Sequence, residues 1–225
     1  MKNILIIAGP SAVGKTTIAH RMLELDDRYE FVRSVTTRPC RGDQFNSEYI
    51  YITDAEFRAL IETKGVLEHT EYAGNFYGTP RSEIDRITSA GKIPLLILDI
   101  NGVTSLYNNA GDISVCGVYV YDDIDVMEER LYERYKDDMD SPDTQKRYDS
   151  RRRQNVIDYS ELPIRESVFY AFIKNCSSVD CCAERIGAIF SDFCNGVSKD
   201  QKANTALALE LSTSVSCKSK YLITF

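Results

Sequence analysis

Short apolar runs alternate along the chain with segments whose apolar residues recur every three or four positions. Continuous apolar runs are typical of strands buried on both faces of a parallel sheet, and the longer spacing is typical of helices. The runs predict strands at 2–8, 93–100, 115–121 and 169–173. The helical spacing predicts helices at 16–25, 82–90, 124–135 and 178–193, with a further helix beginning at Ser141. This alternation predicts an α/β fold with a mostly parallel sheet and flanking helices.

Residues 31–80 interrupt this alternation. Strand-like runs at 31–37 and 49–53 are followed by a helix for which Asp54 is the expected N-cap. A Gly-Asn turn at 74–75 then joins two further short runs, which predicts a β-hairpin. We therefore expect a small β-rich insert in this segment.

The composition changes again from about residue 197, where Ser, Thr, Lys and Ala dominate before an apolar end at 221–225. This pattern predicts either a loose segment or an additional edge strand. No role for the segment follows from its residues.

The chain has 225 residues, 43% of them hydrophobic, and a formal net charge of −7. This length suits one α/β domain with a small subdomain, and the negative charge disfavours nucleic acid as the main partner. No apolar run approaches the roughly 18 residues of a membrane-spanning helix, and the N-terminus lacks the layout of a signal peptide. Seven cysteines without a pair of C-x-x-C elements indicate reduced thiols in the cytoplasm, with a zinc site as the less favoured alternative.

Residues 9–16 (GPSAVGKT) fit the pattern G-x-x-x-x-G-K-[ST] between a predicted strand and a predicted helix. This order lets backbone N–H groups converge on phosphate oxygens at the positive end of the helix. Lys15 is then expected to reach the β- and γ-phosphates of ATP, and the Thr16 hydroxyl to bind Mg²⁺. The expected ATP-binding residues are Gly9, Pro10, Ser11, Ala12, Val13, Gly14, Lys15, Thr16 and Thr17. A glycine turn that binds no ligand is the alternative.

A second group of polar residues lies in the insert. Arg38 and Arg41 are three residues apart with a proline between them, so that both guanidinium groups can bind one phosphate. Tyrosine hydroxyls can add neutral donors, and Glu68, in an apolar stretch, needs the paired N–H donors that a purine edge supplies. The residues of this group are Ser34, Arg38, Arg41, Tyr49, Glu68, Tyr77 and Thr79. Taken singly, the arginines could belong to a solvated turn and Glu68 to the surface.

The same segments resemble the guanylate kinase family, from Ile4 to about Phe193. The family motif T-T-R-x-P-R-x-G-[DE] is matched by residues 36–43 (TTRPCRGD), with the proline one place early. The motif G-N-x-Y-G-[TS] is matched by residues 74–79 (GNFYGT). The resemblance implies a P-loop NTPase-type fold that transfers the γ-phosphoryl group of ATP to GMP with the help of Mg²⁺.

The resemblance also implies roles for single residues. Arg38, Arg41, Tyr49 and Tyr77 would hold the GMP phosphate, and Ser34, Glu68 and Thr79 would read guanine. Gly78, Asp99 and Asn101 complete the expected GMP site, and Asp99, near the end of the apolar strand, is also expected to hold Mg²⁺ through water. The expected catalytic residues are Lys15, Arg38, Arg134 and Arg147, the last two from a helical lid, with Arg151 as a further candidate.

The expected organisation is a P-loop kinase core at 1–30 and 81–196 with a lid at about 130–155, a GMP-binding insert at 31–80 and a tail at 197–225. Three features depart from the family. Asn101 stands where the family has a second aspartate, residues 136–140 of the lid (KDDMD) are acidic rather than basic, and the tail has no counterpart.

Two other functions stay open at this point. A related P-loop kinase for another phosphorylated acceptor, such as a ribose bisphosphate, would not need Glu68, Tyr77 and Thr79. A non-catalytic guanylate-kinase-like module that binds protein partners would be expected to lose Lys15 and the acceptor arginines, which are present. We expect a cytoplasmic monomer or homodimer that binds ATP and GMP or dGMP, and neither nucleic acid nor a membrane.

Replacement of Lys15 by alanine tests the phosphate loop. The Lys15→Ala variant is expected to lose at least about a hundredfold in kcat, because the transferring phosphoryl group loses a cation. A coupled assay of ADP release with ATP, Mg²⁺ and GMP measures this loss. Turnover at the wild-type rate would show that the loop takes no part in catalysis.

Overall fold

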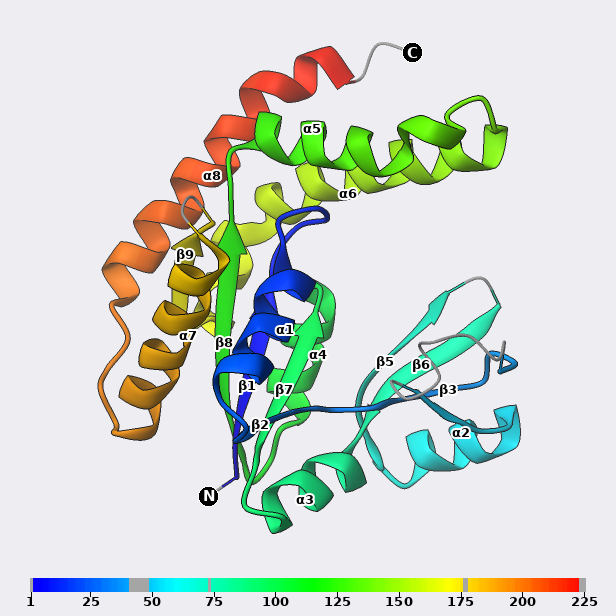
Figure 1. The fold of residues 1–225 in the computed structure, drawn as a ribbon, viewed down its shortest axis with the longest axis vertical. Coiled ribbons are helices and arrows are strands. Elements are labelled where there is room, and N and C mark those ends of the chain that lie inside the picture. Colours follow the sequence, from blue (N-terminus) through cyan, green and yellow to red (C-terminus); the bar gives the residue numbers. More distant parts are fainter. Residues whose placement is uncertain (1, 41–48, 73, 176–177, 223–225) are drawn as a thin grey trace. The chain divides into compact units, whose positions relative to one another are not determined.

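The computed structural model describes residues 2–40, 49–72, 74–175 and 178–222. The chain divides into two compact units, the first formed by Met1–Ile6 and Met22–Cys116 and the second by Ile7–Arg21 and Gly117–Phe225. The strands are β1 (Lys2–Ala8), β2 (Tyr29–Phe31), β3 (Ser34–Thr36), β4 (Tyr49–Tyr51), β5 (Val66–Tyr72), β6 (Asn75–Pro80), β7 (Ile93–Leu98), β8 (Ile113–Tyr121) and β9 (Ala171–Lys174) (Figure 1).

The helices are α1 (Lys15–Leu25), α2 (Asp54–Glu62), α3 (Arg81–Ser89), α4 (Ile100–Asn109), α5 (Ile124–Tyr135), α6 (Pro142–Arg165), α7 (Val179–Cys194) and α8 (Gln201–Leu222). Two short 3₁₀ helices, η2 (Lys136–Asp138) and η3 (Glu166–Val168), adjoin the ends of α5 and α6. Among the helices of the described ranges, none has the length and apolar character that crossing a membrane requires.

The main sheet has five parallel strands in the order β2-β7-β1-β8-β9. Its strands β1, β7, β8 and β9 correspond to the four apolar runs of the sequence. β1 is buried from Ile4 to Ala8, as expected for a strand that is covered on both faces. The predicted α/β fold with a parallel sheet is therefore confirmed.

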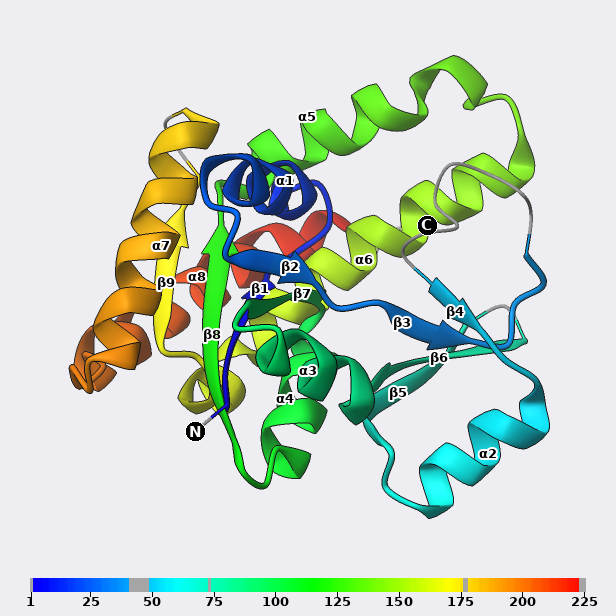
Figure 2. The same cartoon turned by 60° about the horizontal axis from the view of Figure 1, so that its bottom comes forward.

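The first unit contains a second sheet of four strands in the order β4-β3-β6-β5 (Figure 2). β3 pairs in parallel with β4 and antiparallel with β6, and β6 pairs antiparallel with β5. Phe57 of α2 packs against this sheet beside Val35 and Val66, and its ring stacks on that of Phe76 at 5.2 Å. The helix and hairpin expected between residues 31 and 80 are present as α2, β5 and β6.

Local details of this unit differ from the sequence expectations. Thr53, rather than Asp54, caps α2, because its hydroxyl accepts the Glu56 N–H while the Glu56 carboxylate accepts the Thr53 N–H at 2.7 Å. The run at 31–37 is divided between β2 in the main sheet and β3 in the second sheet, so that the chain changes sheets at 32–33. α4 was not expected at all.

The second unit ends in a helix where the sequence suggested a loose segment or an edge strand. α8 packs against α6 and buries Ala208, Leu211 and Val215 (Figure 2). At its start, the Asn204 side chain donates to the Tyr170 carbonyl at 3.2 Å. The buried positions recur every three or four residues, but the small and hydroxylated residues between them hide this signal. The expectation for this segment is therefore wrong.

Glu83 is the centre of a group of ion pairs at the start of α3. Its carboxylate accepts hydrogen bonds from Arg33 at 2.8 and 2.9 Å and from Arg86 at 2.9 and 3.1 Å. Arg33 lies in the link between β2 and β3, so these bonds tie that link to α3. Arg33, and after it Arg86, lower the pKa of Glu83 to about 2.

This lowered pKa predicts that Glu83 contributes to stability against acid. The ionised group stabilises the fold above the ordinary carboxyl pKa of 4.5, and the contribution is lost as the pH falls from there toward about 2. The Glu83→Gln variant is expected to be less stable than the wild type at neutral pH, and the difference to shrink as the pH falls through this window. Urea unfolding at several pH values measures it, with the exposed Glu62→Gln as control. A difference that does not change with pH would contradict the assignment.

Candidate active site

β1 leads directly into the phosphate loop, and α1 begins at Lys15, immediately after it. At Gly9 the backbone has a φ of +146°, and a Cβ there would lie 2.1 Å from the Val120 carbonyl oxygen of β8. Glycine is therefore required where the loop passes the neighbouring strand. Ala12 and Gly14 also have positive φ values, 65° and 100°, as in backbone that turns N–H groups toward an anion.

The Lys15 ammonium is held over this loop. Its Nζ donates to the carbonyl oxygens of Gly9 and Pro10 at 2.6 and 2.8 Å. A triphosphate would replace these carbonyls as partners of the charge, so the cation is in place before the ligand binds. Thr16 and Thr17 are exposed in the first turn of α1. A hydroxyl oxygen here, together with phosphate oxygens, is the hard donor set that suits Mg²⁺, so Thr16 fits the expected metal.

Two asparagines that no sequence motif marks also contact the loop. Asn155 of α6 accepts the Ser11 N–H at 2.7 Å and donates to the Ser11 carbonyl at 3.1 Å. Asn175, which follows β9, donates to the Val13 carbonyl at 2.8 Å and accepts from the Cys182 thiol at 3.2 Å. These pairs lie 144 and 162 positions apart along the chain, so no spacing rule could have found them.

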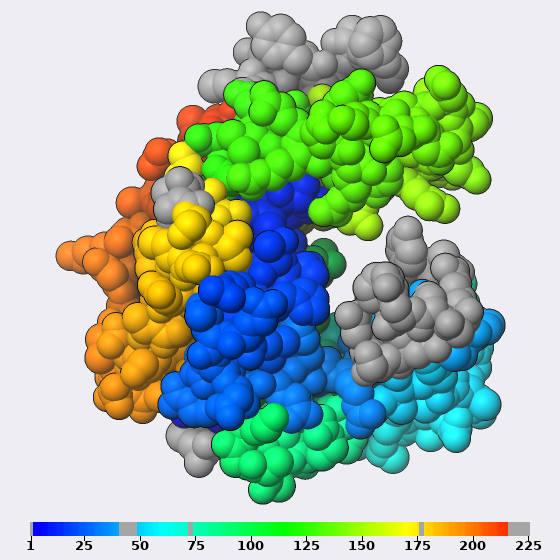
Figure 3. Space-filling model, viewed as in Figure 1, coloured from blue at the N-terminus to red at the C-terminus, as the bar shows by residue number. Residues whose placement is uncertain are grey.

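Arg151 is the arginine of α6 that the structure brings to the phosphate loop, where its Nη1 donates to Ser11 Oγ at 3.2 Å. The expected lid arginines, Arg134 of α5 and Arg147 of α6, are exposed, and no ion pair joins either of them to a residue of the described ranges. α5 and α6 pack together in one continuous surface, green to yellow-green in Figure 3. The roles of Arg134 and Arg147 stay a prediction.

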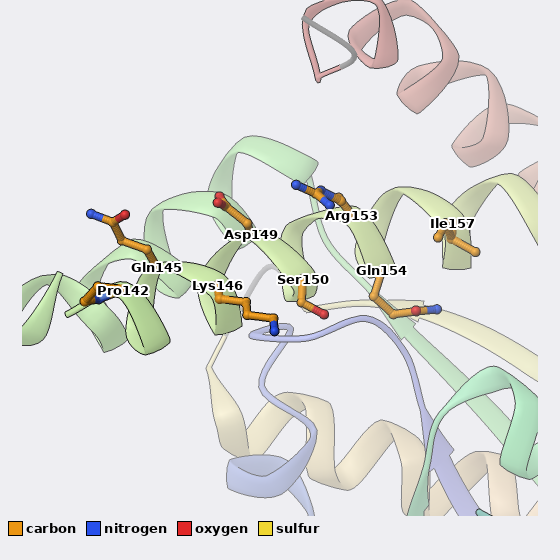
Figure 4. Close-up of a pocket in the computed structure, with 8 residues that line it drawn as sticks. All are labelled: Pro142, Gln145, Lys146, Asp149, Ser150, Arg153, Gln154 and Ile157. Atoms are coloured by element: carbon orange, nitrogen blue, oxygen red, sulfur yellow. The ribbon is translucent and has the colours of Figure 1, made fainter. Parts of the chain in front are cut away.

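A pocket of about 570 Å³ follows one face of α6 from Pro142 to Ile157 (Figure 4). Its lining residues recur every three or four positions and carry charges of both signs, as at Lys146, Asp149 and Arg153. None of the residues expected to bind a nucleotide lines it. The pocket therefore lies on the same helix as Arg147 and Arg151 but includes neither of them.

In the first unit, Arg38 lies among three tyrosines. Its Nη2 donates to the Tyr51 hydroxyl at 3.4 Å, and its guanidinium carbon lies 5.2 Å from the centre of the Tyr49 ring. Tyr77 of β6 meets Tyr49 edge-on, with ring centres 6.2 Å apart. The Arg38 Nε is buried and has no hydrogen-bond partner within the described residues. A guanidinium with an unsatisfied donor beside phenolic hydroxyls can hold a single phosphate group.

Tyr51 was not among the expected site residues. It is two positions from Tyr49 on β4, so both side chains lie on the same face of the strand. That alternation is the signal in the sequence that could have identified it. Arg41, the expected second arginine of this group, lies outside the described residues.

Glu68 and Thr79 form a buried pair on the neighbouring strands β5 and β6. Glu68 is 8% exposed, and the Thr79 hydroxyl donates to its Oε1 at 2.6 Å. Burial raises the pKa of Glu68 despite this bond, and the charge of Asp99 raises it further. At Gly78 a Cβ would lie 2.9 Å from the Glu68 carbonyl oxygen, so glycine permits the close approach of the two strands. The carboxylate is a strong acceptor for paired N–H donors.

The remaining expected residues of the first unit lie at element ends. Asp99 caps α4, where its Oδ1 accepts the Gly102 N–H at 2.7 Å. Asn101 is exposed in the first turn of the same helix, and Ser34 is half-buried on β3. Asp99 and Thr16 belong to different units, and the binding of one Mg²⁺ by both stays a prediction.

The parallel sheet and the phosphate loop define a P-loop nucleotide-binding fold. A family model described as guanylate kinase matches residues 1–174. Guanylate kinase of Salinibacter ruber is 36% identical over 142 residues, which cover 62% of this chain and 75% of that protein. Guanylate kinase of Lactiplantibacillus plantarum is 30% identical over 191 residues, which cover 83% of this chain and 85% of that protein. The crystal structure of guanylate kinase from Anaplasma phagocytophilum has the same fold, with a TM-score of 0.58 at 22% identity over 84% of this chain and 85% of that one.

The chain therefore belongs to the guanylate kinase family, the phosphotransferases that pass a phosphoryl group from ATP to GMP.

The raised pKa of Glu68 predicts that this residue destabilises the protein without ligand. Ionising a buried carboxyl disfavours the folded state, so stability falls as the pH rises from the ordinary carboxyl pKa through the raised pKa of Glu68. The Glu68→Gln variant is expected to exceed the wild type at neutral pH by about 1 kcal/mol, or roughly 2–4 °C in Tm. Calorimetric scans at neutral pH and at about pH 4, where the advantage should vanish, measure this. A lower Tm of the variant at neutral pH would contradict it.

Proposed function

We propose that this chain phosphorylates GMP with ATP as donor, through the residues expected from its sequence. One observation supports this most. The Arg38 group with its tyrosines and the buried Glu68–Thr79 pair are built on adjoining strands of one unit. A purine monophosphate needs such a combination, one site for its phosphate and one for its base.

The chemistry of the pair favours guanine. Guanine presents N1–H and a 2-amino group on one edge, and both donate to a carboxylate such as that of Glu68. Adenine presents an unprotonated N1 at the same place, whose lone pair would face the Glu68 carboxylate and add no hydrogen bond to the one from Thr79. We include Ser34, Asp99 and Asn101 in the base site, where the Asn101 carbonyl oxygen can accept from the 2-amino group.

In the proposed reaction, a phosphate oxygen of GMP forms a bond to the γ-phosphorus of ATP while the bond to the β–γ bridging oxygen breaks. Lys15 and backbone N–H groups of the phosphate loop hold the donor, and Arg38, with Arg41, holds the acceptor. Mg²⁺, when bound by Thr16 and through water by Asp99, would neutralise charge on the β- and γ-phosphates. Arg134 and Arg147, together with Arg151, are proposed to stabilise the transferring group.

This proposal extends to the organisation of the protein. Residues 1–30 and 81–196 would form the kinase core with a lid at about 130–155, and residues 31–80 the GMP-binding insert. We further propose a cytoplasmic monomer or homodimer whose partners are ATP and GMP or dGMP.

A coupled assay with ATP, Mg²⁺ and a panel of acceptors tests the proposal. GMP and dGMP are expected to exceed AMP, CMP, UMP and ribose phosphates by at least about a thousandfold in kcat/KM, because the wrong acceptors leave buried polar groups unpaired. Faster turnover of a ribose phosphate than of GMP would overturn the function.

The Arg38→Ala variant tests the acceptor site within the same assay. Its KM for GMP is expected to rise about tenfold or more, with the KM for ATP unchanged, because a charged partner of the phosphate is lost. Arg58→Ala is the matched control, since Arg58 is an exposed arginine of α2 that lies over the Phe76 ring, 5.5 Å from its centre. An equal effect of both substitutions, or none, would remove Arg38 from the site.

A further inference from the structure

Asn155 stands out on α6 because its side chain is buried and bonds both polar groups of one residue of the phosphate loop. It is 2% exposed. Its Oδ1 accepts the Ser11 N–H at 2.7 Å, and its Nδ2 donates to the Ser11 carbonyl at 3.1 Å. An amide side chain offers a donor and an acceptor on neighbouring atoms, which the N–H and C=O of one residue require.

The residues one turn before and one turn after Asn155 on α6 also form hydrogen bonds. Arg151, four positions earlier, lies on the same face of the helix and reaches Ser11 Oγ at 3.2 Å. Tyr159, four positions later, donates its hydroxyl to the Asp122 carbonyl at 2.7 Å and accepts the Asp122 N–H at 3.2 Å. α6 is thus attached at three successive turns, twice to the phosphate loop and once just after β8.

The middle attachment decides where Arg151 lies. The two hydrogen bonds fix the orientation of the Ser11 peptide and the distance between the loop and this turn of α6, from which the Arg151 guanidinium extends. A bidentate contact to a backbone N–H and C=O fixes both at once. Tyr159 alone cannot do this, because its partner is on the opposite side of Asn155 from Arg151.

We propose that Asn155 is a positioning residue for phosphoryl transfer, which holds the Ser11 peptide and sets α6 so that Arg151 reaches the phosphate loop. Asn155 touches no substrate in this role and acts through Ser11 and Arg151. The inference rests on the proposed function, because it takes the transfer from ATP as the reaction that Arg151 assists.

Asn155→Ala and Asn155→Asp test the proposal in the full chain, with ATP, Mg²⁺ and GMP. The alanine variant is expected to lose about tenfold or more in kcat/KM for ATP, while the KM for GMP stays unchanged. A loss of this size corresponds to the free energy of one or two hydrogen bonds. Arg153→Ala, an exposed residue of the same helix, is the matched control and is expected to keep the wild-type values.

The Asn155→Asp variant adds a pH profile of activity, measured beside the Tm of the variant at each pH so that a loss of stability is separated from a loss of positioning. When ionised, the introduced carboxylate would place a negative oxygen against the Ser11 carbonyl; when protonated, it would donate to that carbonyl and accept the N–H as asparagine does. Burial favours the protonated form. The activity of Asn155→Asp relative to the wild type is therefore expected to rise at least about fivefold from pH 8.5 to pH 6, whereas that of Asn155→Ala stays constant.

A double-mutant cycle with Arg151→Ala tests the route. If Asn155 acts through Arg151, the loss in kcat/KM for ATP caused by Asn155→Ala should largely disappear in the Arg151→Ala background. The inference would be overturned if the losses caused by Asn155→Ala and Arg151→Ala were additive. It would also be overturned if the activity of Asn155→Asp relative to the wild type did not change with pH. Should Asn155→Ala fail to fold, the pH series of Asn155→Asp decides alone. A wild type that does not phosphorylate GMP would instead refute the proposed function.

Discussion

The close passage of Gly9 over the Val120 carbonyl oxygen is the constraint on which the ATP site depends. A side chain at this point would push the loop off β8, because the place of its Cβ lies 2.1 Å from that oxygen. Once the loop lies there, Asn155 and Asn175 satisfy three of its backbone polar groups. The phosphate loop is therefore held by β8, by α6 and by the chain after β9 as much as by its own sequence.

The residues of the first unit that are proposed to bind the acceptor share a different property, because their polar groups are incompletely paired. Glu68 is buried with one hydroxyl partner from Thr79, and the Nε of Arg38 is buried with no partner in the described residues. Both conditions disfavour the protein without ligand, and both end when a ligand brings the missing donors or acceptors. The incompletely paired groups of the proposed site therefore lower the stability of the ligand-free fold. This is why replacing Glu68 is expected to stabilise that fold.

α6 connects the C-terminal helix α8 with the phosphate loop. The family model matches residues 1–174, and α8 lies beyond them. α8 packs on α6, the helix that reaches the phosphate loop through Arg151 and Asn155. A long helix that holds a loop needs support along its length, and the apolar face of α8 at Ala208, Leu211 and Val215 supplies it.

The sequence by itself determined the parallel sheet and the phosphate loop, and it is also the source of the proposed roles of Arg38, Glu68 and Thr79. These follow from apolar runs and from motifs whose residues are close along the chain, so that local spacing suffices. Tyr51 could have been added from the alternation of β4. The Thr53 cap of α2 could also have been found, because residues 53–56 (TDAE) have the spacing of a capping box. Only the tertiary structure decided that the tail forms α8 and that Asn155 and Asn175 contact the phosphate loop. Contacts between residues more than 140 positions apart depend on how helices and strands pack, and packing leaves no periodic trace in the sequence.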